Sequence, residues 1–467
     1  MKITYFDLID QSYYFPQEGF NIEDGNLFFN DTSIKYLIDK YQTPFKISFL
    51  PKIGDQIKKA KNLFSKAIKQ NNYKGTYNYC YCTKSSHFNF VIEETLRHGI
   101  NLETSSSYDI DIILNLYKKG LINKDKKIIH NGYKTDSYIK KIALLQKEGF
   151  TNSFIILDSK KELEKLQKII KTPIRIGIRM AIDEESQSTY YTSRMGIRAS
   201  EIIDYYNNDI KPRKNVTLEM LHFFVDTGIK DTMYYWSTFI NAMKLYANLK
   251  KNCDTLNAIN IGGGLPIRNN LGFEYDYKFI INQIVANIKD VCSSEGIDDP
   301  DIYTEFGKYT VGESGAIVFE VLDYKQQNDA ELWYIINNSL MTTIPDSWSM
   351  HEKFILLPIN KWDKEYTKVN IGGISCDHSD YYNSEDLNQE IYLPKIDDKD
   401  KEPLYIGFFH TGAYQDSISG YGGIKHCLIP SPRHIVIKRN ENGQYEDYLF
   451  KDEQNAEVML DILGYND

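Results

Sequence analysis

Between residues 76 and 304, the chain alternates short apolar runs with longer stretches in which apolar residues recur every three or four positions. The short runs have the length of buried strands, and the longer stretches, such as 163–170 and 232–249, have the periodicity of amphipathic helices. The predicted strands occupy residues 76–82, 100–103, 127–130, 153–157, 174–180, 217–224, 257–261 and 301–304. Strand–helix units repeated eight times over about 250 residues are typical of a TIM barrel.

A doubly wound open sheet is the structural alternative to this barrel, but no GxGxxG sequence follows the first strand.

The pattern of apolar residues changes on either side of the predicted barrel. Beyond about residue 312, strand-like runs separated by turn residues replace the helical periodicity, at 315–340, 353–375, 391–410 and 432–450. We therefore predict an α/β barrel over residues 45–312, a mainly antiparallel β domain over 313–467, and an N-terminal segment, 1–44, that joins the β domain.

Composition narrows the class of protein. The chain has 467 residues, a net charge of −9 and no long basic block, so nucleic acid is not an expected partner. Its six cysteines show no CxxC pair and no Cys/His ligand spacing, which gives no sign of a disulfide framework or a zinc site. No run of about eighteen apolar residues occurs. We expect a cytoplasmic enzyme with no membrane partner.

One lysine stands where a barrel places its chemistry. Lys84 follows the strand at 76–82 directly, and a helix is expected over residues 86–97. Catalytic residues of barrel enzymes lie at the C-terminal ends of the strands, so Lys84 is a candidate nucleophile. The other polar candidates at strand ends are Glu103, Asp109, His130, Asn131, Lys134, Arg179, His222, Asp226, Thr227, Glu305 and Lys308.

Two further stretches give Lys84 a chemical context. Three glycines at 262–264 follow the seventh strand, where backbone N–H groups can approach an anion; a flexible tight turn is the plainer alternative. Glu305 follows the eighth strand and is either a carboxylate for a ring nitrogen or a partner of Arg179. An amine, an anion cradle and a carboxylate together are what pyridoxal 5′-phosphate (PLP) requires.

Several motifs, in order along the chain, resemble one enzyme family. They are Tyr81-Cys82-Thr83-Lys84, Asn131-Gly132-Tyr133-Lys134, Ser193-Arg194-Met195-Gly196, the three glycines, Pro345-Asp346-Ser347-Trp348, Cys376-Asp377-His378-Ser379-Asp380 and Gly412-Ala413-Tyr414-Gln415. With these motifs the chain resembles the fold-type III PLP decarboxylases, which pair an alanine racemase-like, PLP-binding barrel with a C-terminal β domain. The Pro-Asp-x-Trp and Gly-Ala-Tyr-Gln elements make it most similar to the biosynthetic arginine decarboxylases.

The resemblance implies a role for each candidate residue. Lys84 would bind the cofactor covalently, Glu305 would pair with its ring nitrogen, and Cys376 would return a proton to the substrate carbon. Asp377 is the candidate for holding the cationic end of the substrate, and Asp346 is a candidate for substrate binding or for domain packing. The implied cofactor-binding residues are Lys84, Glu103, Arg179, His222, Phe224, Thr227, Gly262, Gly263, Gly264, Glu305, Gly307, Lys308 and Tyr414. In this family Cys376 and Asp377 reach into the barrel of a neighbouring subunit, which implies a homodimer or a larger assembly.

The chain departs from the family pattern around the expected ring-stacking position. Where the family has His-x-Gly-Ser, this chain has Phe-Val-Asp-Thr at 224–227, so Phe224 would stack on the cofactor ring and an acid stands near the phosphate. His222, two residues earlier on the same strand face, is the alternative ring partner. The family's Glu-Pro-Gly-Arg is Glu-Phe-Gly-Lys at 305–308, so a forked phosphate contact becomes a point charge.

The resemblance implies decarboxylation of L-arginine to agmatine and carbon dioxide, in polyamine biosynthesis. Two alternatives stay open: a sibling decarboxylase acting on meso-diaminopimelate, ornithine or carboxynorspermidine, and a catalytically silent regulatory paralogue. The resemblance also implies an association with Mg²⁺, but no carboxylate cluster for this ion stands out in the sequence, and no metal site is predicted.

Overall fold

The computed structural model describes residues 4–5, 14–182, 193–382 and 390–465. The chain divides into two compact units. One unit comprises Gly54–Pro266 and Tyr275–Thr310, and the other comprises Met1–Ile53, Ile267–Glu274 and Val311–Asp467. Helix α3 (Leu50–Gln70) carries the chain from the second unit into the first.

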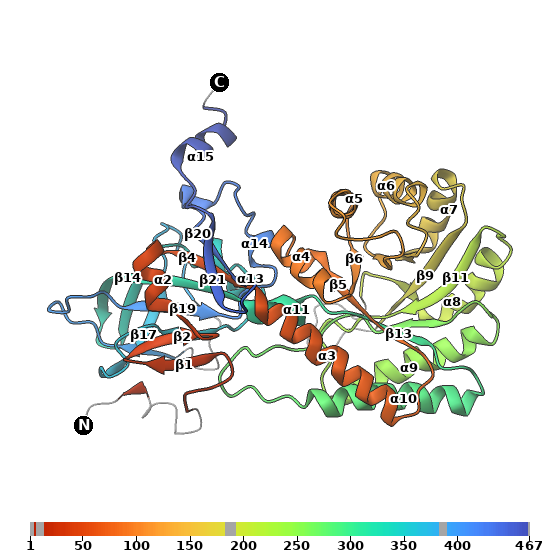
Figure 1. Ribbon diagram of the computed structural model, residues 1–467, viewed down its shortest axis with the longest axis horizontal. Coiled ribbons are helices and arrows are strands. Elements are labelled where there is room, and N and C mark those ends of the chain that lie inside the picture. The colour runs from red at the N-terminus through yellow and green to blue at the C-terminus, as the bar shows by residue number, and fades with distance from the viewer. Residues whose placement is uncertain (1–3, 6–13, 183–192, 383–389, 466–467) are drawn as a thin grey trace. The chain divides into compact units, whose positions relative to one another are not determined.

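The first unit is a closed barrel of eight parallel strands, so the predicted fold is confirmed (Figure 1). The strands are β5 (Tyr77–Cys82), β6 (Asn101–Thr104), β7 (Ile128–His130), β8 (Ser153–Leu157), β9 (Ile174–Ala181), β11 (Val216–His222), β12 (Ala258–Asn260) and β13 (Asp301–Glu305). Each strand pairs in parallel with its successor in this order, β13 pairs with β5, and the ring is thereby complete. A short strand, β10 (Ile197–Arg198), adds to β9.

Helices alternate with the strands and surround the barrel. They are α4 (Asn89–Arg97), α5 (Ser107–Lys118), α6 (Asp136–Lys147), α7 (Lys160–Ile169), α8 (Ala199–Tyr205), which continues into η2 (Tyr206–Ile210), α9 (Met233–Lys250), α10 (Tyr277–Glu295) and α11 (Lys308–Val311). Figure 1 shows α5, α6 and α7 side by side in chain order. Ser106 and Asp109 form a capping box that starts α5, and the Thr135 hydroxyl caps α6, so each helix begins soon after its strand ends.

Side chains fill the interior of the barrel. The core cluster contains Cys80, Ile129, Phe154, Ile156, Met220, Ala258 and Tyr303. Cys80 packs in this core, whereas the hydroxyls of its neighbours Tyr79 and Tyr81 lie 2.7 Å from Thr310 Oγ1 and 2.9 Å from the Ser86 carbonyl. Because the interior is filled, the chemistry of the barrel is confined to the ends of its strands.

The second unit is mainly antiparallel sheet, also as predicted. Its larger sheet contains β4 (Phe45–Phe49), β14 (Gly315–Asn328), β15 (Glu331–Ile336), β16 (Ile355–Pro358), β17 (Tyr366–Gly372), β18 (Ile391–Pro394), β19 (Tyr405–Phe409), β20 (Arg433–Arg439) and β21 (Tyr445–Lys451). The long strand β14 pairs with β4, β15 and β19, all antiparallel. Ala316 and Val318 belong to one apolar core and Ile317 and Phe319 to another, so β14 separates two cores by simple alternation.

The N-terminal residues pack on this sheet. They form strands β1 (Phe20–Glu23), β2 (Asn26–Phe29) and β3 (Thr32–Ser33), followed by helix α2 (Ile34–Tyr41). The rings of Phe20 and Phe29 each lie 5.1 Å from the ring of Phe409 in β19. The remaining helical elements of the unit are η3 (Gly312–Ser314), α12 (Leu340–Thr343), α13 (Asp346–Ser349), α14 (Gln415–Ile418), η4 (His426–Leu428) and α15 (Ala456–Ile462). Among the described residues of both units, no helix has the length and apolarity to cross a membrane.

Candidate active site

Lys84 lies in a short turn, η1 (Thr83–Ser85), that follows β5 directly. Thr83 and Ser85 are buried, whereas Lys84 is exposed. The Thr83 hydroxyl lies 3.0 Å from Asp109 Oδ1 and 3.1 Å from the Glu103 carbonyl oxygen, which fixes the turn to β6 and to the first turn of α5. The buried neighbours therefore hold the backbone in place while the Lys84 amine remains accessible.

The opposite side of this turn packs against the end of β13 through Gly307. A Cβ at this position would collide with Ser85 Oγ and would lie 3.1 Å from Cys82 Cβ. Gly307 thus serves close packing of the lysine-bearing turn. Lys308, the next residue, is half-buried and begins α11.

Two asparagine side chains hold the Glu305 carboxylate at the end of β13. Asn260 Nδ2 donates to Oε1 at 2.6 Å, and Asn131 Nδ2 donates to Oε2 at 2.9 Å. His222 Nε2 lies 3.7 Å from Oε2. All four side chains are buried, and they come from the carboxyl ends of β13, β12, β7 and β11. Each carboxylate oxygen has its own N–H donor, which stabilises the ionised form out of water.

The protonation states of Glu305 and His222 follow from their surroundings. Burial alone would raise the pKa of Glu305, but the lowering effects are larger in sum and come from His222, the Asn131 amide, Lys84 and the Asn260 amide. Burial lowers the pKa of His222 to about 4, although Glu305 opposes this shift. At neutral pH His222 is therefore an uncharged ring beside the Glu305 carboxylate, which accepts from the two amides.

Glu103, in β6, is a second buried carboxyl of the same barrel mouth. Neither of its carboxylate oxygens has a hydrogen-bond partner among the residues that the structure describes. Burial raises the pKa of Glu103 to about 7, while Lys84 opposes the shift and Glu305 adds to it. The two carboxyls thus differ, because the pKa of Glu305 lies below its ordinary range and that of Glu103 lies above it.

The three glycines after β12 form a turn that leaves no room for side chains. Gly262 and Gly264 have φ angles of +69° and +99°. A Cβ on Gly263 would lie 2.7 Å from the Glu305 carbonyl oxygen. Gly262 N donates to Asn260 Oδ1 at 2.9 Å, whereas the N–H groups of Gly263 and Gly264 have no acceptor in the described part of the chain. The turn presents two backbone donors and no side chain, which is the form of an anion cradle.

Phe224 lies beside this glycine turn, and His222 does not. A Cβ on Gly262 would lie 2.9 Å from Phe224 Cδ2, and the Arg179 guanidinium is 5.8 Å from the centre of the Phe224 ring. His222 is 1% exposed and lies beside Glu305. The strand predicted at 217–224 ends two residues earlier in the structure, at His222. Of the two rings, Phe224 is thus the one beside the phosphate cradle.

The segment after Phe224 has local hydrogen bonds of its own. Asp226 is exposed, and its Oδ1 accepts the Thr227 N–H at 2.9 Å. The backbone donor of Thr227 is thereby occupied, which leaves its hydroxyl as the group available for an anion. Burial lowers the pKa of Arg179, against the attraction of Asp158, Glu305 and Glu103, and the guanidinium stays charged.

The remaining predicted site residues lie in the second unit. Asp346 Oδ2 accepts from Gln415 Nε2 at 2.8 Å, and this bond joins the Pro-Asp-x-Trp and Gly-Ala-Tyr-Gln segments. Tyr414, half-buried, has a φ of +67°. Cys376 is exposed with its Sγ 3.3 Å from Cys427 Sγ, and this contact raises the pKa of Cys376. Asp377 follows directly and is partly exposed.

Asn131 and Asn260 bind Glu305 in a way that was not predicted from the sequence. Asn260 ends β12, and Asn131 stands one residue after the end of β7. Asn131 is among the polar candidates predicted at strand ends, although its bond to Glu305 is not. Asn260 is not among them, and its position at the end of a strand was the available signal.

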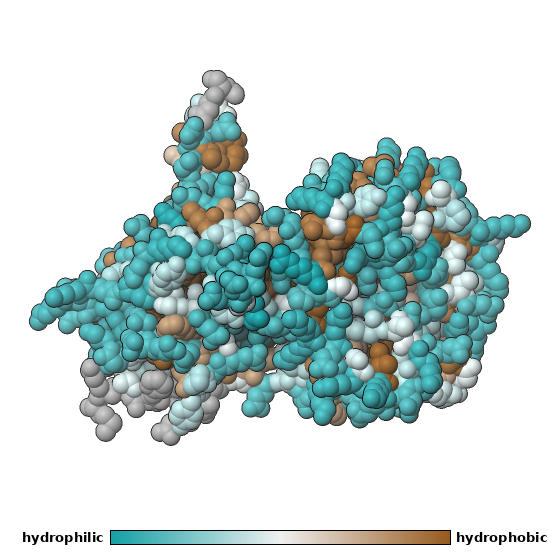
Figure 2. Space-filling view, viewed as in Figure 1, coloured by the Kyte–Doolittle hydropathy of each residue, from teal (hydrophilic) through white to brown (hydrophobic). Residues whose placement is uncertain are grey.

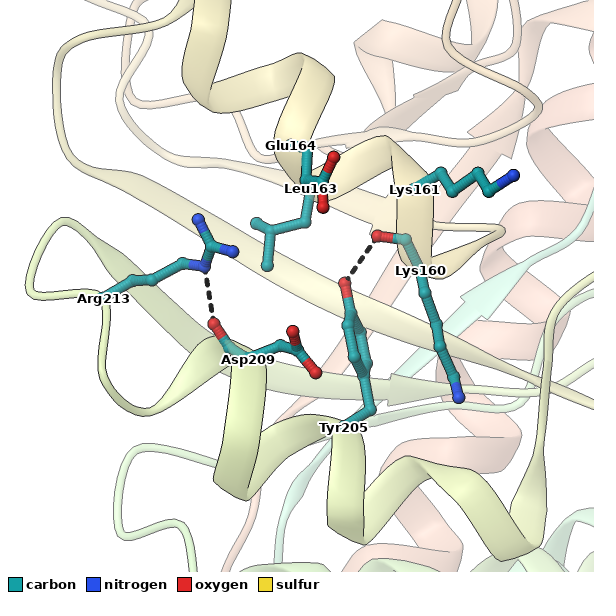
Figure 3. A pocket seen from close by; sticks show the side chains of 7 residues that line it. All are labelled: Lys160, Lys161, Leu163, Glu164, Tyr205, Asp209 and Arg213. Atoms are coloured by element: carbon teal, nitrogen blue, oxygen red, sulfur yellow. Dashed lines mark hydrogen bonds between the residues drawn. The ribbon is translucent and has the colours of Figure 1, made fainter.

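A small pocket on the outside of the barrel is separate from this site. Its lining residues are Lys160, Lys161, Leu163, Glu164, Tyr205, Asp209 and Arg213, from α7 and from the end of α8 (Figure 3). Tyr205 Oη donates to the Lys160 carbonyl at 3.0 Å, and Arg213 Nε donates to the Asp209 carbonyl at 2.6 Å (Figure 3). None of the residues at the barrel mouth lines this pocket, so it plays no part in the chemistry of that mouth.

The residues at the barrel mouth fit PLP. An accessible amine, a buried ionised carboxylate, an aromatic ring beside the cradle and two glycine N–H groups without acceptors match the aldehyde, ring nitrogen, ring face and phosphate of that cofactor. Fold and site together define a barrel enzyme of the PLP-dependent class. PLP, when bound, supplies a ring that accepts the electron pair left by a departing group.

Comparisons with known proteins identify the family. Residues 54–312 match the family model described as pyridoxal-dependent decarboxylase, pyridoxal binding domain. The chain belongs to the pyridoxal-dependent decarboxylases.

Relatives and solved structures extend the similarity over both units. The chain is 24% identical to a biosynthetic arginine decarboxylase of Prochlorococcus marinus (91% of this chain, 83% of the relative) and 22% identical to one of Bacteroides thetaiotaomicron (93% and 86%). Its fold is similar to the crystal structure of the biosynthetic arginine decarboxylase of Campylobacter jejuni, with TM-score 0.78, 22% identity and coverage of 96% and 89%. It is also similar to diaminopimelate decarboxylase from Helicobacter pylori, with TM-score 0.72, 18% identity and coverage of 92% and 99%.

Replacement of Asn260 tests the link between the carboxylate and the cradle. Asn260→Ala removes the donor to Glu305 Oε1 and the acceptor of the Gly262 N–H, so PLP affinity should fall by about 5-fold to 150-fold, equivalent to about 1–3 kcal/mol. The measurement is a titration of the cofactor-free chain with PLP, followed by the absorbance of the bound cofactor. Asn257→Ala, at an exposed asparagine just before β12, is the matched control and should bind like the parent. Equal affinity in both variants would contradict the link.

His222 should make folding stability depend on pH. Its pKa is about 6.5 in an unfolded chain and about 4 in the folded one. Its contribution is therefore complete above pH 6.5 and is lost as the pH falls toward 4, because the unfolded chain takes up a proton first; the loss reaches about 3 kcal/mol. Urea unfolding across this range should show a smaller loss in His222→Gln than in the parent. His378→Gln, at an exposed histidine, should keep the parental pH dependence, and identical curves for His222→Gln would show the inference to be wrong.

Proposed function

We propose that this chain catalyses the PLP-dependent decarboxylation of L-arginine to agmatine and carbon dioxide. One observation carries the chemistry: Lys84 is accessible at one strand end while Glu305 is held ionised at the neighbouring one by two amide donors. The choice of arginine is supported by the names of the relatives that align with more than nine-tenths of the chain. It is supported further by the second-unit motifs at residues 345–348 and 412–415.

Each of the polar and aromatic residues at the barrel mouth has its own role in the proposed reaction. Lys84 would hold the cofactor through its exposed amine. The Glu305 carboxylate holds a proton on the ring nitrogen, and Asn131 and Asn260 keep that carboxylate ionised and oriented. Phe224 packs against the ring face. The N–H groups of residues 263–264 and the Thr227 hydroxyl bind the phosphate, with Lys308 and Tyr414 as further contacts.

The second unit provides the substrate-binding and proton-donating groups of the proposal. Cys376 is an exposed thiol that returns a proton to the substrate carbon after carbon dioxide leaves. Asp377 accepts from the guanidinium of the substrate, since a carboxylate matches a planar, permanently charged cation. Asp346 is bonded to Gln415 and orients the adjoining Tyr414 segment, so its role toward substrate is indirect.

We propose that the active enzyme is a homodimer or a larger assembly in which active sites are shared between subunits. Helix α15 carries exposed apolar side chains at Val458, Leu460 and Ile462, Leu463 follows it directly and is also exposed, and Figure 2 shows apolar atoms gathered there. Monomeric proteins seldom leave contiguous apolar surface on a terminal helix, so this surface supports an oligomer. Carbon dioxide release measured with and without a chelator tests the association with Mg²⁺ that the resemblance implies.

Carbon dioxide release by the PLP-loaded protein tests the reaction and its substrate together. Arginine, ornithine, lysine and meso-diaminopimelate are offered in parallel, and release is expected from arginine, with agmatine as product. Lys84→Ala should lower the rate at least about a hundredfold, while Lys74→Ala, at an exposed lysine just before β5, should not. Release from another amino acid would contradict the role proposed for Asp377. No release from any of them would favour a silent paralogue.

Subunit mixing tests whether sites are shared. Lys84→Ala and Cys376→Ala should each be inactive, and exchange of their subunits at equal ratio should restore about a quarter of the parental activity, because half of the dimers then contain one complete site. Mixing Lys84→Ala with Glu305→Ala is the control, since both changes lie in the same unit and no complete site can form. Absence of recovery in the first mixture, with exchange verified by mass spectrometry, would refute shared sites.

A further inference from the structure

The second unit contains a cluster of metal-binding side chains, of which the proposed reaction uses only Cys376. Cys376 Sγ and Cys427 Sγ lie 3.3 Å apart, and these sulfurs and the His426 ring offer ligand atoms that all lie within 4.8 Å of one another. All three residues are exposed. His426 Nε2 lies 3.6 Å from Asp377 Oδ2, so a carboxylate stands beside the cluster. Two thiols, an imidazole and a neighbouring carboxylate form the donor set of a tetrahedral site for a thiophilic cation.

This cluster was not predicted from the sequence because its members come from two distant segments. Cys376 stands in the loop after β17, and His426 and Cys427 begin η4. The two cysteines are 51 positions apart, which matches no ligand spacing of a local metal motif. The fold, and not a sequence motif, brings them together.

The loop that carries Cys376 is held in place by the side chain of Asp380. This buried carboxylate accepts from Ser339 Oγ at 3.0 Å and from Leu340 N at 2.8 Å, at the start of α12. It also accepts from Ser375 N at 3.1 Å, directly before Cys376. One carboxylate therefore ties the cysteine-bearing loop to the N-terminal end of α12.

The second segment is fixed to the other end of the same helix. The buried Lys425, directly before His426, donates from Nζ to the Thr342 carbonyl at 2.9 Å. Asn338 contacts both segments, since its carbonyl accepts from Ile374 N at 3.2 Å and its Nδ2 lies 3.5 Å from the Pro430 carbonyl. Residues 338–342 thus hold the two segments in register, and the thiols are brought together before any ion binds.

We propose that Cys376, Cys427 and His426 bind one Zn²⁺ ion per chain, with Asp377 or water in the fourth position. A tetrahedral zinc ion with Zn–S bonds of about 2.3 Å places its two sulfurs about 3.8 Å apart, so the pair at 3.3 Å needs to open by only about half an ångström. A disulfide needs the two sulfurs to approach to about 2.05 Å, and it would not involve the His426 ring. The smaller movement and the imidazole both favour the metal.

Zinc binding would have a consequence for the reaction, and this part of the inference rests on the proposed role of Cys376. The ion binds thiolates, so each thiol gives up its proton to solvent as its S–Zn bond forms, and no oxidant or reductant takes part. Cys376 then has no proton to return to the substrate carbon. The bound ion would therefore inhibit the decarboxylase, and a chelator would restore it.

Titration of the PLP-loaded, fully reduced protein with Zn²⁺, and with Co²⁺ as a spectroscopic substitute, tests the site. We expect one ion per chain, a thiolate-to-cobalt charge-transfer band, and at least tenfold weaker binding in Cys427→Ser and in His426→Asn. His378→Asn is the matched control, because His378 is exposed and two residues from Cys376 but outside the cluster. Equal binding by all variants would overturn the proposal. A Cys376–Cys427 disulfide formed by added peroxide, in a protein that binds no zinc, would overturn it too.

The result of the zinc-binding measurement does not depend on whether the proposed function is correct. If zinc binds with the expected stoichiometry and variant pattern and carbon dioxide release falls to the same extent, both the site and the role of Cys376 are supported. If zinc binds in that way and release is unchanged, the metal site stands and the proton-donor role of Cys376 fails. If the protein releases no carbon dioxide from any substrate, the proposed function fails, and the charge-transfer band and stoichiometry still decide the metal site.

Discussion

The chemistry of this barrel depends on keeping one carboxylate ionised out of water. Burial of a charged group costs far more than a single hydrogen bond contributes, so an unsupported glutamate at the position of Glu305 would take up a proton. The two amides that prevent this come from β7 and β12, on either side of β13 in the ring but not from adjacent chain segments. No local segment can assemble this arrangement, and the carboxylate keeps its charge on burial only because the closed barrel brings both amides to it.

Much of the fold could be read from the sequence because each layer of the barrel leaves a simple pattern. Its strands are short apolar runs, its helices have apolar residues at helical spacing, and the two alternate, so all eight strands were placed. Lys84 was found for the same reason, since it directly follows the first of those runs. The bonds from Asn131 and Asn260 to Glu305 were not predicted, because a hydrogen bond between distant strands depends on register around the closed ring, which periodicity does not encode.

Two other features could not be predicted from the sequence, for related physical reasons. The apolar run predicted a strand through residue 224, but β11 ends at His222. In the second unit the loop of Cys376 and the turn of Cys427 are positioned by the two ends of a four-residue helix, α12, through Asp380 and Lys425. Such contacts are specific pairs between remote loops, and apolar periodicity carries no information about them.

The barrel mouth contains buried polar groups that the protein itself leaves unsatisfied. Glu103 has no hydrogen-bond partner for either carboxylate oxygen among the described residues, and neither ring nitrogen of His222 has one. Each such group lowers the stability of the empty chain, so the site is maintained at some loss of folding stability. A ligand that binds only the folded form offsets that loss by mass action. When PLP is scarce, a larger fraction of the chain would therefore be unfolded and open to proteolysis, and the amount of enzyme would follow the supply of the cofactor even at an unchanged rate of synthesis.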